Sequence, residues 1–270
     1  MRKRWTDRED AVLRDAYGKQ PYREIYAQLP GRTRCSIKGR ARNIGLHGNK
    51  TVVMPLAMKT YSVRHDYFSI PNIENSYWAG FLAADGCISP RRNSVKVQLQ
   101  AGDADHLCLF AKNVGYDGSV KQCNGGSYKS ESKQAVLNIC GVNSWVDDLK
   151  SVFNVTERKS LTLRPPVGLS NECMLAYAVG YIDGDGSIGV AKGKYKQSIY
   201  MYDVISLRGT DAVLQCVKHL FDVLAPSRGV EAKVHSYAGY AQYRVAGRRA
   251  DVLLSAMRCL DTPKMNRKWL

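Results

Sequence analysis

The amino-acid sequence has no long apolar run. None of the apolar stretches in its 270 residues approaches the roughly 20 residues that a bilayer-spanning helix needs. The N-terminus, MRKRWTDRED, carries basic residues but no apolar segment behind them, so it lacks the pattern of a secretory signal. We therefore expect an intracellular protein, in cytoplasm or nucleoid, that has no membrane partner.

The cysteines also lack the spacing of a metal-binding or disulfide motif. Eight cysteines lie far apart, with no CxxC pair and no histidines at zinc-ligand spacing. This pattern argues against a zinc finger and against a small disulfide-linked scaffold. We expect reduced thiols, most of them in the core, because free cysteine is among the residue types most often buried.

Acidic residues are few relative to basic ones. The chain has 24 Asp and Glu against 40 Lys and Arg, which gives a net charge of +16 and a pI near 9.5. A polyanion is therefore the expected partner, and nucleic acid is the leading candidate. At 270 residues the chain is long enough for two or three compact units.

The first fifty residues form a basic module. They hold thirteen basic and five acidic side chains and so carry half of the net charge. Thr6 and Glu9 have the spacing of a helix capping box, and Thr33 precedes a third helical segment that Gly45 would end. Three short helices with a basic last one are typical of a helix-turn-helix, whose last helix enters the major groove. The candidate DNA contacts are Arg34, Lys38, Arg40 and Arg42.

The pattern W…L…Y…EI…L…RT…I..RA..IGL in this module resembles the small Myb/SANT-type helix-turn-helix modules of phage and bacterial proteins. The resemblance implies an all-α DNA-binding domain at residues 1–50 and favours a phage or bacterial host. The alternative is a solvated basic helix in a structural bundle. The following segment mixes Gly, Pro, Asn and scattered apolar residues without a period, so we expect a linker at 51–72.

The rest of the chain contains an internal duplication. YWAGFLAADGCIS at 77–89 aligns without a gap with YAVGYIDGDGSIG at 177–189. A later marker aligns Asp105 with Asp211, and the growing offset indicates insertions in the loops of the second copy. We expect two half-domains, at 73–160 and 173–270, joined by a linker at 161–172.

Each half reads as helix, two strands, helix, two strands, helix. Val95, Val97 and Leu99 alternate with long polar side chains, so this strand has one apolar and one polar face. The expected fold class is α+β, with two pseudo-symmetric α-β-β-α-β-β-α half-domains plus the small all-α domain. The predicted elements are 75–85, 86–90, 94–101, 103–114, 117–122, 134–140 and 143–153 in the first half, and 173–185, 186–193, 199–207, 210–223, 229–235, 240–246 and 247–259 in the second.

Both repeated motifs place small residues four positions apart on one helix face, which lets two helix backbones approach closely. We expect the two helices to pack on each other and to bring Asp85 and Asp185, at their ends, side by side. These small residues are Gly80 and Ala84 in the first copy, and Gly180 and Gly184 in the second.

Two carboxylates forced together at the negative ends of two helices repel each other unless a cation lies between them. Oxygen ligands from Asp85 and Asp185, with the backbone carbonyls of Ala84 and Gly184, suit Mg²⁺. Such a metal cluster can activate water and stabilise both oxygens of a phosphodiester displacement. The motif therefore predicts a magnesium-dependent site for phosphodiester hydrolysis.

The runs WAGFLAADG (78–86) and AVGYIDGDG (178–186) resemble the paired signatures of single-chain LAGLIDADG homing endonucleases, and the resemblance covers roughly residues 73–270. It implies saddle-shaped antiparallel sheets over DNA, a monomer, and cleavage of both strands across the minor groove at a long asymmetric site. It also implies that the eighth motif position, Asp85 and Asp185 here, binds metal, with two or three divalent ions at the half-domain interface.

The sequence departs from the family pattern at the sixth motif position. This position is Asp183 in the second copy but Ala83 in the first. In the family it is not the metal ligand, so its loss in one copy leaves activity possible. A cap or a helix-packing acid is the simpler interpretation of Asp183.

The family also places basic and polar residues beside each active site. Lys159 and Lys268, in equivalent Arg-Lys pairs, are the basic candidates, and ordinary phosphate contacts or solvated lysines are the alternative. A polar residue at the end of the second strand positions water in relatives. Gln100 and Ser206 are the nearest equivalents in this chain.

DNA contacts are expected on the polar faces of the strands, because Lys, Arg, Gln and Tyr side chains reach phosphates and base edges. A solvated strand face would have the same composition and is the alternative. The candidates are Arg91, Arg92, Lys96 and Gln98 in the first hairpin; Lys192, Lys194, Lys196, Gln197 and Arg208 in its counterpart; and Tyr237, Tyr240, Gln242 and Arg244 in the later strands.

The function that these features predict is a monomeric, Mg²⁺-dependent, site-specific endonuclease for double-stranded DNA, a homing endonuclease with an added helix-turn-helix module. Two unlike halves in one chain predict a non-palindromic site. A DNA-binding regulator of the same fold that no longer cuts is one alternative. An RNA maturase that binds its host intron RNA is another.

Overall fold

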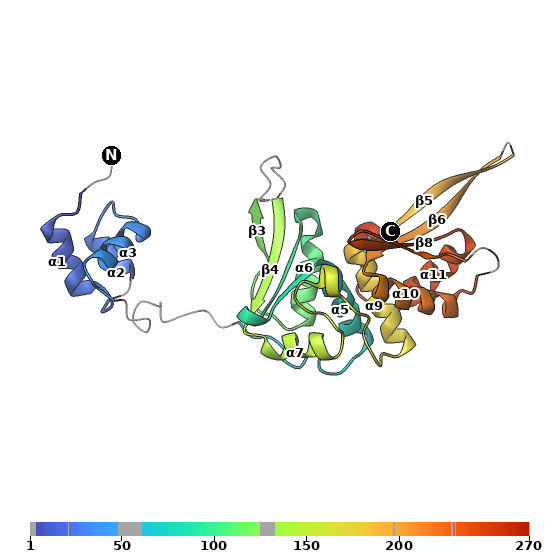
Figure 1. Cartoon of the computed structure of the whole chain (residues 1–270), viewed down its shortest axis with the longest axis horizontal. Coiled ribbons are helices and arrows are strands. Elements are labelled where there is room, and N and C mark those ends of the chain that lie inside the picture. Colours follow the sequence, from blue (N-terminus) through green and yellow to red (C-terminus); the bar gives the residue numbers. More distant parts are fainter. Residues whose placement is uncertain are drawn as a thin grey trace. The chain divides into compact units, whose positions relative to one another are not determined.

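The computed structural model describes residues 4–20, 22–47, 61–124, 133–196, 198–227, 229 and 231–269. By its internal contacts the chain divides into two compact units, Met1–Tyr61 and Ser62–Leu270. Each unit has its own hydrophobic core, so each is described by itself (Figure 1).

The first unit contains three helices. The predicted capping box is present, because the Thr6 hydroxyl accepts the Glu9 amide (3.3 Å) and the Glu9 carboxylate accepts the Thr6 amide (3.0 Å). Thr33 caps the third helix by accepting the Ser36 amide at 3.2 Å. The helices are α1 (Asp7–Ala16), α2 (Tyr22–Gln28) and α3 (Arg34–Asn43). Their buried core comprises Leu13, Ala16, Ile25, Leu29 and Ile37.

Helix α3 carries the predicted DNA contacts of this unit. Arg34, Lys38 and Arg42 are exposed. Arg40 instead forms an ion pair with Asp10 of α1, and its Nε lies 2.8 Å from the Asp10 carboxylate. Arg40 therefore contributes to the packing of α3 on α1, whereas the other three side chains form the exposed basic surface of the helix.

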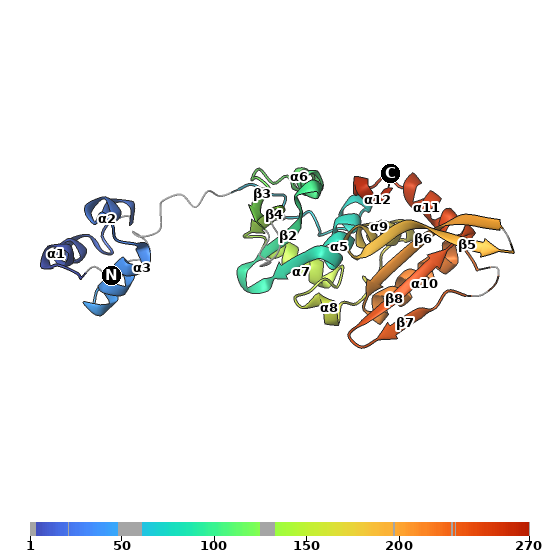
Figure 2. The same ribbon diagram turned by 90° about the horizontal axis from the view of Figure 1, so that it is seen from above.

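The second unit repeats one arrangement twice. Each half contains a helix, a hairpin, a second helix, two more strands and a third helix, and each has a four-stranded antiparallel sheet in the same order, β1-β2-β4-β3 and β5-β6-β8-β7 (Figure 2). This confirms the predicted α+β fold class. The first half comprises α5 (Ile73–Asp85), β1 (Gly86–Ser89), β2 (Ser94–Gln100), α6 (Ala104–Asn113), β3 (Lys121–Asn124), β4 (Lys133–Cys140) and α7 (Asn143–Ser151). The second half comprises α9 (Asn171–Asp185), β5 (Gly186–Tyr195), β6 (Ser198–Gly209), α10 (Asp211–Leu224), β7 (Val234–Tyr237), β8 (Tyr240–Ala246) and α11 (Arg248–Cys259).

A short helix follows each half, and neither was among the predicted elements. They are α8 (Lys159–Thr162) and α12 (Asn266–Trp269). The hairpin of the second half is also longer than that of the first, since β5 and β6 have 10 and 12 residues against 4 and 7 in β1 and β2. The two halves therefore share a topology but differ in the segments around it.

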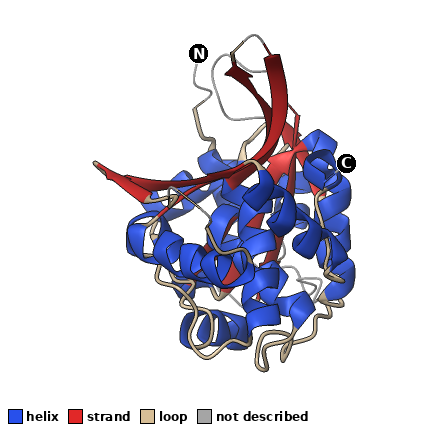
Figure 3. Ribbon diagram, turned by 90° about the vertical axis from the view of Figure 1, so that its right-hand side faces the viewer, coloured by secondary structure: helices blue, strands red, loops and turns tan. Residues whose placement is uncertain are grey.

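Each sheet has a buried face and an exposed face. Strand β2 shows the predicted alternation, because Val95, Val97 and Leu99 are buried against helices of the same half. Figure 3 shows the strands along one side of the helices. We call the exposed side the open face. It carries Lys96, Gln98 and Gln100 in the first sheet, and Ser206, Arg208, Gln242 and Arg244 in the second.

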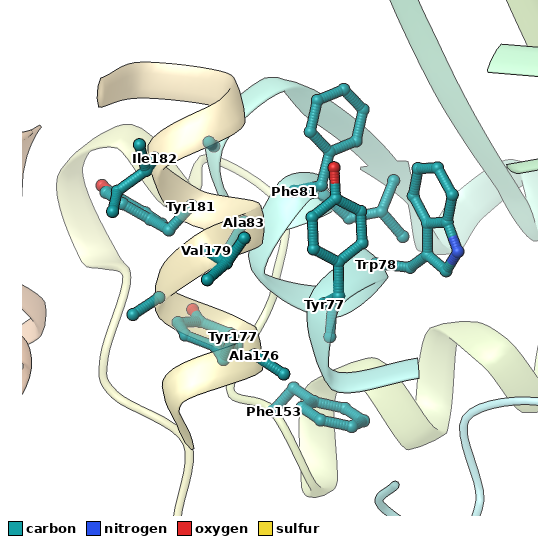
Figure 4. Close-up of a cluster of buried hydrophobic side chains, with 14 of the residues drawn as sticks. Tyr77, Trp78, Phe81, Ala83, Phe153, Ala176, Tyr177, Val179, Tyr181 and Ile182 are labelled. Atoms are coloured by element: carbon teal, nitrogen blue, oxygen red, sulfur yellow. The ribbon is translucent and has the colours of Figure 1, made fainter. Parts of the chain in front are cut away.

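Helices α5 and α9 pack against each other at the centre of the second unit (Figure 1). A Cβ atom added at Gly80 would lie 2.0 Å from the Tyr177 carbonyl oxygen, and one added at Gly180 would lie 1.9 Å from the Tyr77 carbonyl oxygen. Both positions therefore require glycine for the backbones to approach this closely. Around this contact lie Tyr77, Trp78, Phe81, Ala176, Tyr177, Val179, Tyr181 and Ile182 (Figure 4).

Part of the predicted linker packs against the second unit. Tyr67 and Phe68 are buried in its core, and Trp145 donates its indole N–H to the Arg64 carbonyl at 2.8 Å. Residues 51–60 of this linker lie outside the described residues. In the part of the chain that the structure describes, no helix combines the length and the apolar character that crossing a membrane needs.

The burial of the cysteines was predicted wrongly. All eight lie within the described residues and are free thiols, but only Cys173 is buried and Cys216 is half-buried. The other six occupy outward positions of helices and strands. Cys87 and Cys140 lie on the open face of the first sheet, because Cys87 pairs with Lys96 and Cys140 with Ser94.

Candidate functional site

Helices α5 and α9 end side by side, and each ends in an aspartate. The close packing continues to their last turn. A Cβ atom added at Gly184 would lie 2.2 Å from the Cβ of Ala84 and 3.3 Å from the Asp85 amide nitrogen. Position 184 therefore requires glycine for the two helix ends to meet. The chain turns into β1 and β5 directly afterwards, which leaves Asp85 and Asp185 together at this junction.

The pKa values of both aspartates are raised at this junction. The pKa of Asp85 is raised above its ordinary value, first by loss of solvent around the carboxylate and then by the negative charge of Asp185. Loss of solvent also raises the pKa of Asp185. Lys159 and Lys268 oppose both shifts. Raised carboxylate pKa values mean that this junction favours binding of a proton or another cation.

Lys159 and Lys268 lie at equivalent places beside the two helix ends. Lys159 is the first residue of α8, and its ammonium group donates to the Ala84 carbonyl. Lys268 lies in α12 and contacts several carbonyls at the end of α9. Its Nζ donates to Ile182 O (2.8 Å), Asp183 O (2.7 Å) and Gly186 O (2.8 Å), with a longer contact to Gly184 O (3.3 Å).

Burial lowers the pKa of both lysines, while the neighbouring aspartates raise it. For Lys159 the opposing charges are Asp185 and then Asp85; for Lys268 Asp183 comes first. The structure thus brings together Asp85, Asp185, Lys159 and Lys268, which the sequence predicted as one site.

The oxygen atoms at the two helix ends fit a hard divalent cation. Besides the two carboxylates, the carbonyl oxygens of Ala84 and Gly184 lie at the helix ends. All of these are oxygen ligands of the kind that Mg²⁺ prefers. Both carbonyls accept hydrogen bonds from lysine ammonium groups, so they face a region that attracts positive charge. The described residues contain no cluster of three or more His, Cys, Asp or Glu side chains suited to a metal. A cation at the junction would therefore complete its coordination with water and phosphate oxygens.

The register of the two hairpins shows which residue of the second half is equivalent to Gln100. Opposite Gly86 stands Val97, and opposite Gly186 stands Leu207. Gln100 lies three residues after Val97, and the residue three positions after Leu207 is Thr210. Thr210 is therefore the equivalent of Gln100, and the predicted equivalence of Gln100 and Ser206 is wrong. The physical reason is a 3-10 turn at Ala101–Asp103, which separates strand from helix in the first half only. Gln100 is exposed at the end of β2, on the open face.

Asp183 is fully buried two residues before the end of α9. Its carboxylate accepts three hydrogen bonds, from the Tyr77 hydroxyl (2.6 Å), the Met265 amide (2.9 Å) and the Trp269 indole N–H (2.6 Å). Burial raises its pKa, and these donors oppose the shift. The sequence did not reveal this network. Its one signal was the difference between Asp183 and Ala83 in otherwise matching motifs.

His106 extends the network into the first half. Its Nε2 lies 2.8 Å from the Tyr77 hydroxyl, whose own proton goes to Asp183, so Nε2 carries the hydrogen and donates it to Tyr77. Burial lowers the pKa of His106 to about 4. The ring is therefore neutral at pH 7, with its proton on Nε2.

Basic and aromatic side chains line the open face next to the junction. Arg208 lies over the Tyr240 ring (5.5 Å from its centroid), and Tyr240 stacks on Tyr237 at 5.0 Å. A cavity of about 200 Å³ connects them to the junction, since Lys159 and Asp185 line it together with Arg208 and Tyr240. The second sheet thus presents planar and cationic groups beside the carboxylates.

The remaining predicted DNA contacts lie on the other face of the second sheet or at the ends of the two hairpins. Lys192 and Lys194 pair with Met201 and Ile199, which continue the face of the buried Ile205. They therefore lie on the opposite face from Arg208 and Arg244. Arg91 and Arg92 are exposed in the 3-10 turn that joins β1 to β2, and Lys196 is exposed at the end of β5–β6. Gln197 lies outside the described residues.

The comparisons with known proteins concern the arrangement of the chain alone. No protein-family model matches the sequence, and no curated protein gives a significant match. Several solved structures are similar. The I-LtrWI LAGLIDADG homing endonuclease bound to target DNA has a TM-score of 0.46 at 9% identity, covering 75% of this chain and 86% of that chain.

Two further structures are similar to about the same degree. The LAGLIDADG meganuclease I-AabMI bound to uncleaved DNA has a TM-score of 0.45 at 13% identity, covering 72% of this chain and 86% of that chain. The meganuclease I-SmaMI bound to uncleavable DNA has a TM-score of 0.45 at 13% identity, covering 70% and 85%.

The buried neutral His106 makes the stability of the fold depend on pH. Its pKa of about 4 in the folded state lies below the ordinary 6.5, so between these values only the unfolded chain takes up the proton. The free energy of unfolding therefore falls as pH falls through this window, by about 1.4 kcal/mol per unit and about 3 kcal/mol in all.

The measurement is urea unfolding of the full chain from pH 7 to pH 4. His106→Gln keeps a donor to Tyr77 but has no titrating ring, so it should lose this part of the slope. His235→Gln, at an exposed position of β7, is the control and should follow the wild type. Equal slopes for the wild type and His106→Gln would contradict the assignment.

Proposed function

We propose that the chain is a site-specific endonuclease for double-stranded DNA, of the LAGLIDADG homing endonuclease type, that uses divalent metal ions. The observation that carries the proposal is the junction of α5 and α9, where Gly184 fits against Ala84 and brings one aspartate from each copy together. Two carboxylates from two equivalent motifs, each with its own lysine, suit a reaction performed twice, once on each strand.

Each residue of the junction has a chemical task in this proposal. Asp85 and Asp185 hold the cations, with the carbonyls of Ala84 and Gly184 as further ligands. When bound there, Mg²⁺ would supply Lewis-acid stabilisation of the phosphate and a water molecule of lowered pKa. Lys159 and Lys268 keep an ammonium group next to the charge that develops on the phosphate oxygens. Their pKa values are lowered by burial.

The open faces of the two sheets are the proposed DNA-binding surface. They carry Lys96 and Gln98 in the first sheet and Arg208 and Arg244 in the second. The open face of the second sheet adjoins the junction through the cavity beside Tyr240. Phosphate contacts from Lys and Arg supply affinity, while Arg and Gln can read base edges. Because the two halves differ in hairpin length and side chains, the proposed site is non-palindromic and a monomer suffices.

The first unit is proposed to be a helix-turn-helix module, at residues 1–50, that adds affinity for DNA or lengthens the DNA sequence that is recognised. Its support is the exposed basic set on α3, with Arg34, Lys38 and Arg42, and the net charge of this segment. The proposed half-domains are 73–160 and 173–270. The proposed partner is double-stranded DNA. Structured intron RNA is the alternative partner, which a competition experiment distinguishes.

The proposal is tested by cleavage of a randomised double-stranded DNA library with Mg²⁺, followed by sequencing of the cut ends. The wild type should produce breaks at one long asymmetric motif. Asp85→Asn and Asp185→Asn should abolish double-strand cleavage, because each removes a charged ligand while keeping size and shape.

Two other outcomes would redirect the assignment. Enrichment of one sequence by binding, with no cutting in Mg²⁺ or Mn²⁺, would identify a DNA-binding regulator. Tighter binding to structured intron RNA than to any DNA in competition would identify a maturase. Cleavage that survives in Asp85→Asn and Asp185→Asn would contradict the proposed role of the junction.

The two faces of the second sheet allow a matched test of the DNA-binding surface. Arg244→Ala on the open face should weaken binding to the selected site about tenfold, within the range for loss of one base or phosphate contact. Lys192→Ala removes the same charge from the opposite face and should leave Kd unchanged. The measurement is fluorescence anisotropy with EDTA present. An equal loss of affinity in both variants would contradict the assignment of the face.

A further inference from the structure

Asp183 is the one acidic side chain that is buried among the described residues. A buried carboxylate is costly unless it is hydrogen-bonded or paired. Helix packing alone does not require it, because the equivalent position in α5 is Ala83, which is 2% exposed and packs without a polar group. The acid in the second copy therefore calls for a different explanation.

Two of the three donors to Asp183 belong to the segment around α12. The Met265 amide precedes this helix, and the Trp269 indole N–H comes from its last residue. The Lys268 amide donates to the Met265 carbonyl at 2.9 Å and closes the turn between them. One carboxylate thus holds both ends of the turn that carries Lys268.

The ammonium group of Lys268 is correspondingly well fixed. Three carbonyl oxygens accept from it at 2.8 Å or less, and one of them is that of Asp183 itself. Asp183 therefore binds the segment through its side chain and the lysine through its backbone.

The first half uses another anchor for its lysine. Helix α8, which begins at Lys159, is followed by the buried Leu163, whose carbonyl accepts the Thr210 hydroxyl at 2.7 Å. Position 83 is alanine, whose side chain has no hydrogen-bond acceptor for this segment. The described hydrogen bond of the Lys159 ammonium group goes to the Ala84 carbonyl alone. The two lysines are equivalent in place but are held by different residues.

We propose that Asp183 is a positioning residue that sets Lys268 at one of the two reaction centres, so that loss of its carboxylate slows cleavage of one DNA strand. The inference rests on the proposed endonuclease function. It goes beyond that function because it makes the two halves unequal: Lys268 depends on Asp183, whereas Lys159 does not.

The test measures cleavage of each strand separately. A duplex with the selected site carries a different fluorophore on each 5′ end, and single-turnover rates are taken with the full-length protein. Lys268→Met and Lys159→Met first assign one strand to each lysine. Asp183→Asn keeps the size of the side chain but turns one acceptor oxygen into a donor, so it loses one of its bonds to the α12 segment.

The expected result is strand-selective. Asp183→Asn should slow the strand assigned to Lys268 about tenfold to 100-fold, the range expected for a displaced catalytic group, and should leave the other strand and the DNA Kd unchanged. Trp269→Phe, which removes one tether and keeps a large ring, should slow the same strand less. Asp147→Asn, an exposed acid on α7, is the control and should affect neither strand. Equal slowing of both strands by Asp183→Asn, or slowing of the Lys159 strand, would overturn the proposal.

A second measurement is independent of activity. Hydrogen exchange of the full-length chain should show faster exchange of amides 265–269 in Asp183→Asn, with amides 159–163 unchanged. Unaltered exchange at 265–269 would overturn the tether. If the wild type cuts neither strand, the endonuclease proposal fails, and the exchange result still decides whether Asp183 positions the Lys268 segment.

Discussion

The close approach of α5 and α9 is the constraint on which the second unit depends. Each helix places a glycine, Gly80 or Gly180, against a carbonyl oxygen of the other, at distances where a Cβ atom cannot fit. The close packing continues to the last turn, where a Cβ atom added at Gly184 would lie 2.2 Å from the Cβ of Ala84. It therefore brings Asp85 and Asp185 together and fixes the starting points of both sheets, since β1 and β5 begin at the next residue.

The chemistry at the junction follows from this packing. Loss of solvent and then the negative charge of Asp185 raise the pKa of Asp85, and the half-buried Lys159 and Lys268 supply part of the compensating charge. The halves then differ in how they hold these groups. The first uses Leu163 and Thr210 around its lysine, whereas the second uses Asp183 and the α12 segment. Under the proposed function, an asymmetric centre of this kind would suit a DNA site whose two strands differ in sequence.

Much of this arrangement could be predicted from the sequence. The gapless repeat of the two motifs located both helices and both aspartates, and the alternation in residues 94–100 gave the two faces of β2. Long-range contacts could not be predicted, because Asp183 meets Tyr77 across 106 positions and Trp269 across 86. The face of Lys192 depends on register, which strand composition leaves open. The cysteines were placed in the core from residue type alone, although their strand and helix positions point outward.

The most direct test of the central claim exchanges one methyl group between the two helices. Gly184→Ala should lower the rate of double-strand cleavage on the order of 100-fold, because its Cβ collides with that of Ala84 and separates the carboxylates. Gly184→Ala combined with Ala84→Gly moves the methyl group to the other helix and should restore cleavage. Single-turnover rates of both variants on the selected site decide the matter. If Gly184→Ala alone cuts like the wild type, the contact between the helix ends does not set the active centre.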